Sequence, residues 1–77
     1  MKETRGRISR IEDERFWLGG DDWFAVGMDI VVEGGDLKAL LERQVDVTVL
    51  YEDIPDEGMH VAFRVFPSGN PQFLRQA

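Results

Sequence analysis

The feature that most constrains the fold is the alternation of apolar and polar positions over residues 24–32. Large apolar residues share one parity there: Phe24, Val26, Met28, Ile30 and Val32. A period of two predicts a half-buried β-strand. The alternation returns twice. One strand is expected to turn Val45, Val47, Val49 and Tyr51 toward the core, and another Met59, Val61, Phe63 and Val65. These stretches predict a mainly β protein.

Weaker signals complete the set of elements. Residues 7–12 and 15–19 read as two further strands, and the spacing of Ile8 and Ile11 indicates a bulge or bend in the first. Between residues 32 and 45, Gly34-Gly35-Asp36 looks like a turn ending in a helix N-cap. Leucines 37, 40 and 41 follow at helical spacing, so one short helix is predicted near residues 36–43.

The order strand, strand, strand, helix, strand, strand is that of a small five-stranded OB-like Greek-key barrel. A chain of 77 residues without cysteine must fold on its apolar core alone. We expect a single barrel over residues 1–67. Residues 68–77 form a C-terminal tail, expected to be partly flexible, because Ser68-Gly69-Asn70-Pro71 signals a turn.

One set of spacings also carries a resemblance, over about residues 5–67. The positions are Gly6, Ile8, Ile11, Phe16, Leu18, Gly20, Asp21, Leu37, Lys38, Val47, Val49, Tyr51, Val65 and Pro67. In these the chain resembles small bacterial OB-like barrel domains of unknown function. The resemblance implies the fold and assigns no chemistry.

Trp17 and Trp23 flank a glycine-acid turn, and hairpin parity predicts where they point. A three-residue loop, Gly20-Asp21-Asp22, would pair Leu18 with Phe24 and Phe16 with Val26, placing those four inside. Both tryptophans would then share the outer face. They either have a structural role, in which they cover a barrel end, pack under Phe73 and Leu74 of the tail or shield a sheet edge, or they anchor a ligand or partner.

Charge limits the partner. Fifteen acidic residues stand against nine Lys and Arg, and the loops that bind ligands in OB-folds are acidic here. They hold Glu12, Asp13 and Glu14 in one and Glu52, Asp53, Asp56 and Glu57 in the other. These carboxylates repel a polyanion, so nucleic acid is an unlikely partner, whereas a protein with a basic surface suits them.

Other chemistry is weakly supported. His60 is the single histidine, read as a solvated residue on an outer parity, and no nucleophile motif or phosphate loop occurs. We therefore expect no enzyme activity, no catalytic residue, no metal site and no cofactor. The charged N-terminus and the lack of a long apolar run predict a soluble, cytoplasmic protein with no membrane segment, unless a leader preceded this stretch.

The sequence thus predicts a small non-catalytic binding module for a protein partner. Its candidate contact residues are Trp17, Trp23, Phe66, Glu12, Asp13, Glu14, Asp53, Asp56 and Glu57. An acidic inhibitor that mimics nucleic acid is a variant of this prediction. The alternative is an OB-type binder of single-stranded nucleic acid or oligosaccharide, and self-association stays open.

Overall fold

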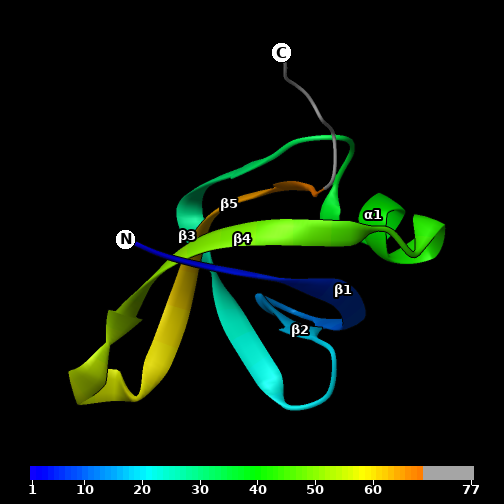
Figure 1. Cartoon of the computed structure of the whole chain (residues 1–77). Helices are drawn as coiled ribbons and strands as arrows, with labels where there is room; N and C mark the ends of the chain where they lie inside the picture. The colour runs from blue at the N-terminus through cyan, green and yellow to red at the C-terminus, as the bar shows by residue number, and fades with distance from the viewer. Residues whose placement is uncertain (69–77) are drawn as a thin grey trace.

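The computed structural model of the chain describes residues 1–68 and shows a closed five-stranded barrel with one short α-helix. The elements are β1 (Lys2–Glu12), β2 (Arg15–Leu18), β3 (Asp22–Val32), α1 (Leu37–Arg43), β4 (Asp46–Ile54), the 3₁₀-helix η1 (Pro55–Glu57) and β5 (Met59–Pro67). Helix α1 lies at one end of the barrel and the β4–β5 connection at the other (Figure 1). The expected tail falls almost entirely on residues 69–77, outside the described part.

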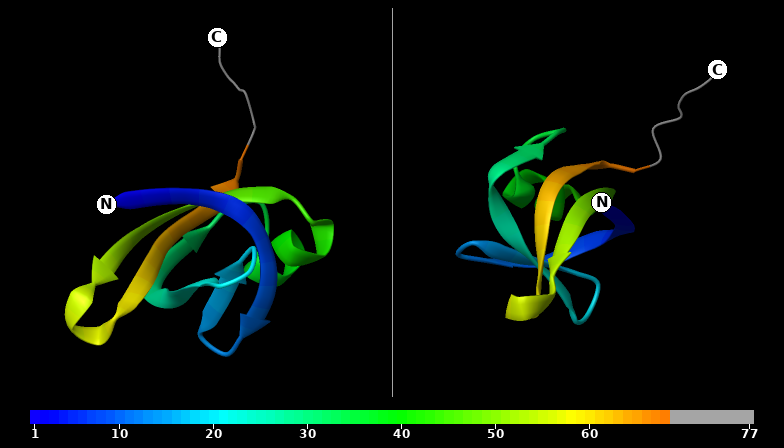
Figure 2. Two further views of the ribbon diagram at one scale, coloured as in Figure 1. Left: turned by 60° about the horizontal axis from the view of Figure 1, so that its bottom comes forward. Right: turned by 90° about the vertical axis from the view of Figure 1, so that its left-hand side faces the viewer.

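The strands close in the order β1-β2-β3-β5-β4, with β4 returning to pair with β1. β5 runs parallel to β3 and antiparallel to β4. This topology, with the helix between β3 and β4, confirms the predicted small OB-like barrel. Figure 2 shows the strands wrapping around a single interior.

The core lies inside this ring. Its fully or nearly buried side chains come from every strand and from the helix: Ile8, Phe16, Leu18, Phe24, Leu40, Val47, Val49, Ala62 and Val65. Phe16 and Phe24 stack with ring centroids 5.5 Å apart. Apolar burial of this kind is the main favourable term in the folding of so small a domain.

The helix begins where the sequence predicts. The carboxylate of Asp36 accepts a hydrogen bond from the Ala39 main-chain nitrogen at 2.8 Å, and Leu40 is buried on the inner side. Gln44 ends the helix in a left-handed conformation with φ of 54°. Strand β4 therefore starts at Asp46, one residue later than the expected Val45.

The β2–β3 hairpin corrects our predicted register. Its loop is Gly19-Gly20-Asp21, and Leu18 pairs with Asp22 while Phe16 pairs with Phe24. The predicted pairs, Leu18 with Phe24 and Phe16 with Val26, were wrong by two residues. A shift of two leaves every side chain on its predicted face, because the side-chain period of a strand is two.

One β-bulge was predicted and is present, whereas bulges in β3 and β5 contradict the inner faces predicted for those strands. The predicted bulge in β1 is present between Ile8 and Arg10. Residues 27–30 of β3, in contrast, lie opposite Phe63 alone, so Met28 points into solvent rather than into the core. Phe63 is itself an extra residue relative to β4, which places Ala62 inside and Val61 and Phe63 outside. One extra residue reverses the faces of a strand.

The same bulge corrects the interpretation of His60. Residues 60 and 62 share a parity, and Ala62 is buried, so His60 lies on the inner side of β5 at the end of the barrel. Its ring packs against Tyr51 and Phe24, with centroids 5.1 and 5.7 Å away. His60 therefore lies on the inner parity, contrary to the prediction, although it is exposed as expected, with 47% of its side chain accessible.

Candidate functional site

The two tryptophans lie on the outer face of β2 and β3. Trp17 and Trp23 are directly opposite each other in the hairpin, and both are half-buried. Phe16 and Phe24, the next pair in the ladder, point inward and stack in the core. The hairpin register thus makes the two tryptophans a cross-strand pair on the face opposite the stacked phenylalanines.

Each tryptophan carries an arginine. The Cζ atom of Arg10, on β1, lies 4.6 Å from the Trp17 ring centroid, and that of Arg15, on β2, lies 4.9 Å from the Trp23 ring. A guanidinium group at this distance is attracted by the ring quadrupole. We call these residues, Arg10, Arg15, Trp17 and Trp23, the tryptophan face. Neither arginine was among the predicted site residues, because only the β1–β2–β3 register shows which rings they meet.

The two arginines differ in their charge partners. Arg10 donates a hydrogen bond to the carboxylate of Glu12. Arg15 makes no ion pair within residues 1–68. The Trp23 indole is therefore the interaction partner that the structure gives for the Arg15 guanidinium.

A hollow of about 620 Å³ adjoins Trp23. Its lining is formed by Asp13, Glu14, Arg15, Trp23, Ala25 and Met59, and we call it the Trp23 hollow. Asp13 and Glu14 form the β1–β2 turn, which is tied to β3 because the Val26 main-chain nitrogen donates to the Glu14 main-chain oxygen at 2.8 Å. Two predicted site residues therefore stand at the rim beside a predicted tryptophan.

The second acidic loop lies next to this hollow. A smaller hollow of about 290 Å³ is lined by Asp53, Ile54, Pro55, Gly58, Met59 and His60. Met59 borders both hollows, so the two loops lie on either side of it. Asp56 and Glu57 are exposed in η1. The structure thus brings the β1–β2 turn and the β4–β5 connection to one region, as the OB-like topology predicts.

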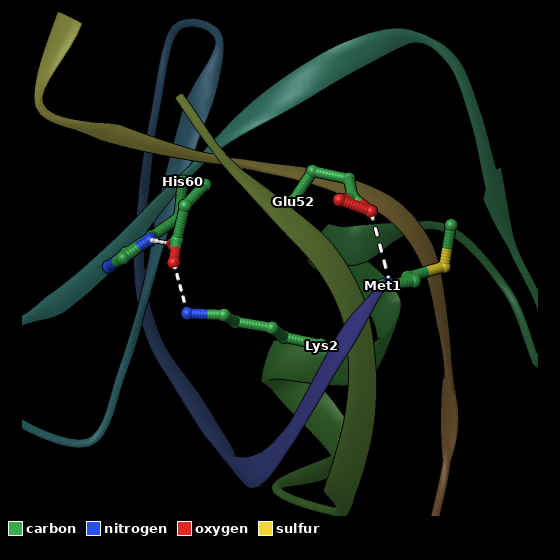
Figure 3. A network of polar contacts seen from close by, with 5 residues as sticks. Met1, Lys2, Glu52 and His60 are labelled. Carbon is green, nitrogen blue, oxygen red and sulfur yellow. Dashed lines mark hydrogen bonds and ion pairs between the residues drawn. The ribbon is translucent and has the colours of Figure 1, made fainter. Parts of the chain in front are cut away.

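The carboxylate of Asp53 is hydrogen-bonded to two other residues of the barrel. Lys2, at the start of β1, donates to one carboxylate oxygen, and the other oxygen is hydrogen-bonded to Nδ1 of His60 (Figure 3). The hydrogen bond from Lys2 lowers the pKa of Asp53, and the same bond raises the pKa of Lys2. Beside this network the Met1 amino group lies 3.2 Å from a carboxylate oxygen of Glu52. These contacts join β1, β4 and β5 at one end of the barrel.

Phe66 does not extend the tryptophan face. It lies opposite Thr48 near the C-terminal end of β5, with the Arg64 guanidinium 5.5 Å from its ring. Met59, which borders the Trp23 hollow, is at the other end of the same strand. Met59 and Phe66 are seven strand steps apart, which corresponds to about 23 Å in an extended strand. The structure therefore separates this predicted site residue from the tryptophans.

The donor types at the site define what it can bind. Indole rings, a thioether and carboxylates suit an apolar or cationic group. Within residues 1–68, no cluster of three metal-ligating side chains is present. No helix of the described part is long and apolar enough to cross a membrane.

Comparisons with protein-family descriptions, with curated proteins and with solved structures give no match for this chain. The fold class therefore stands on the barrel topology, and any function must be argued from the tryptophan face and its surroundings.

Proposed function

We propose that this protein is a non-catalytic binding module whose contact surface for a protein partner is the tryptophan face. One observation carries the proposal: two half-buried tryptophans lie directly opposite each other on the outer face of β2 and β3. Tryptophan and arginine are the residue types most enriched where binding energy concentrates in protein interfaces. Half-buried side chains on strands that pack against a core also lose less conformational entropy on binding than fully exposed ones.

The charge around the face supports a basic partner surface. Two acidic turns flank the tryptophans, with Asp13 and Glu14 at one end of the hairpin and Asp21 and Asp22 at the other. None of these four carboxylates makes an ion pair among the described residues. Unpaired carboxylates attract a cationic surface during encounter and contribute specificity at the rim of an interface.

A retention experiment tests this proposal. Immobilised wild-type protein and a Trp17→Ala, Trp23→Ala variant are exposed to nuclease-treated lysate from the source cells. Each form is first checked by far-UV circular dichroism. We expect a protein that the wild type retains, that the variant loses, and that elutes as the NaCl concentration rises.

Met28→Ala is the matched control. Met28 is a fully exposed apolar residue on β3, so its loss removes outer-face apolar surface away from the tryptophans. It should retain the same partner as the wild type. Equal retention by the double tryptophan variant would contradict the proposal.

A second candidate rests on the arginines. Guanidinium groups beside aromatic rings are also the residue types of platforms that bind single-stranded nucleic acid, and OB-folds bind oligosaccharides on the same strands. Against a polyanion stand the carboxylates of Glu12, Asp13, Glu14, Asp21 and Asp22, five acidic groups around two arginines. Quenching of tryptophan fluorescence by an oligonucleotide, or by an oligosaccharide, would favour this candidate over a protein partner.

A further inference from the structure

The Trp23 hollow holds an unusual arrangement of charge. Arg15 lies over the Trp23 ring and lines the same hollow as Asp13 and Glu14, yet it forms no ion pair with either carboxylate. Arg10, on the neighbouring ring, is neutralised by Glu12. The hollow therefore contains an indole covered by a cation of the protein itself, and two carboxylates that no described cation neutralises.

We propose that the Trp23 hollow is a binding site for an arginine side chain of the partner, and that Arg15 occupies the indole in the free protein and is displaced on binding. This inference rests on the proposed function, because it names the chemical group that the tryptophan face recognises. The incoming guanidinium stacks on Trp23 and donates hydrogen bonds to Asp13 and Glu14.

Charge complementarity selects a cation. The carboxylates of Asp13 and Glu14 stand on a turn fixed by the 2.8 Å bond from the Val26 main-chain nitrogen to the Glu14 oxygen. This bond fixes the main chain of the turn, so both exposed side chains start from a defined position at the rim. An indole with two carboxylates beside it is suited to a positive group and repels an anion.

Guanidinium fits this site better than ammonium. It is planar, it stacks on aromatic faces, and it donates two parallel hydrogen bonds to a carboxylate, which a lysine ammonium does not. The present occupant of the ring is itself a guanidinium group. The hollow, at about 620 Å³, lies in the range of sites that hold a small organic ligand, so a short stretch of peptide enters with the side chain.

Arg15 is able to leave. Its side chain is exposed at the start of β2, and no described carboxylate holds it in place. An exposed cation–π contact is weak, so an incoming arginine that also reaches Asp13 and Glu14 replaces it favourably. Arg15 thereby lowers the affinity of the free protein for cations that make the ring contact alone.

The test uses two synthetic peptides that differ in one charge. Acetyl-Gly-Gly-Arg-Gly-Gly-amide is compared with the same peptide carrying citrulline, the neutral isostere of arginine. In a Trp17→Phe background Trp23 is the single remaining tryptophan, since the chain has two, and its fluorescence reports binding. If that background does not fold, the two indole N–H signals of the ¹⁵N-labelled wild type give the same information. We expect the arginine peptide to bind and the citrulline peptide not to bind.

Three variants assign the roles. Arg15→Gln should tighten binding of the arginine peptide roughly 2- to 5-fold, the range set by the strength of the lost exposed cation–π contact. Asp13→Asn with Glu14→Gln should reduce binding to the level of the citrulline peptide. Arg64→Gln is the matched control, because its guanidinium lies over Phe66 on another strand and should not affect the titration.

Several results would overturn the inference. These are an equal response to both peptides, no gain in affinity for Arg15→Gln, or binding of oligothymidylate in place of the arginine peptide. The retention experiment separates the two proposals. A partner lost by the tryptophan variant, but retained equally by wild type and by Asp13→Asn, Glu14→Gln, leaves the binding module standing and removes the arginine site.

Discussion

Asp53 is the residue at which several strand ends of the barrel meet. Its carboxylate binds Lys2 of β1 and His60 of β5 while Asp53 itself belongs to β4 (Figure 3). The hydrogen bond from Lys2 lowers the pKa of Asp53 from its ordinary value of 3.8 and raises the pKa of Lys2 from 10.5. Each shift links the stability of the barrel to pH.

We predict that Asp53→Asn lowers the urea midpoint of unfolding by a small amount, mainly between pH 3.8 and 10.5. A depressed carboxyl pKa adds stability above the unfolded value, and that stability is lost as pH falls through the folded value. A raised lysine pKa adds stability below the unfolded value, and that stability is lost as pH rises through the folded value. The effect is small because exposed ion pairs are screened by solvent.

Urea titrations of both forms across this pH range provide the measurement. In a Lys2→Gln background, which removes the main cause of both pKa shifts, the same substitution should show a smaller pH dependence. A wild-type advantage that does not begin to shrink as pH falls below 3.8 would contradict the role assigned to this carboxylate, because its protonation removes the bond from Lys2.

Strands β3 and β5 approach each other so closely at Gly27 that a single added carbon atom would disturb their packing. A Cβ added at Gly27 would lie 2.9 Å from the main-chain oxygen of Ala62 and 3.3 Å from Cγ1 of Val61. The parallel pairing of these strands is interrupted just after Val26. Glycine at position 27 therefore lets the two backbones meet before β3 bulges away from β5.

We predict that Gly27→Ala destabilises the protein by about 1–3 kcal/mol, the usual cost of overpacking against a rigid neighbour. Gly20→Ala is the control, since a Cβ there meets nothing within 4 Å, and its expected effect is within about 0.5 kcal/mol of zero. Urea unfolding of the two variants and the wild type measures the difference. Equal midpoints for both variants would mean that β5 moves away from the added Cβ without a loss of stability, which would contradict this prediction.

The helix, with its unbroken periodicity, was predictable from the sequence, whereas the inner faces of the bulged strands β3 and β5 were not. Residues 37–43 combine an N-cap aspartate with leucines at helical spacing, so the helix is found where expected. In β5 the run Met59, Val61, Phe63 and Val65 looks like one inner face, but Phe63 is an extra residue relative to β4. A pattern of two cannot show where a strand gains a residue, because both faces there are apolar.

At the scale of the whole molecule, strand order followed from the order of elements, while the site depended on register. The two tryptophans could be placed on the outer face because Phe16, Leu18 and Phe24 require the inside. The arginines on their rings, and the Lys2–Asp53–His60 contacts, join strands that are not all neighbours in sequence. The arginine contacts depend on the register of β1, β2 and β3, and the Lys2–Asp53 contact depends on barrel closure, neither of which a local pattern encodes.

The barrel has one core, and this predicts cooperative unfolding. Phe16 and Phe24 beneath the tryptophans belong to the same buried cluster as Leu40 of the helix and Val49 and Val65 of the last two strands. No subset of strands among the described residues has a separate core to retain. Tryptophan fluorescence, which reports the β2–β3 hairpin, and far-UV circular dichroism, which reports all elements, should therefore give the same urea midpoint.

Phe16→Ala makes this prediction stricter. Phe16 has no exposed surface and stacks on Phe24, so its truncation should cost about 3–5 kcal/mol and shift both unfolding curves together. Phe63→Ala, at a residue that is 36% exposed, should shift them far less. A fluorescence midpoint below the circular dichroism midpoint, in either form, would instead mean that the hairpin opens while the other strands stay folded. The tryptophan face would then be a mobile contact surface, and its binding energy would have to include the cost of ordering the hairpin.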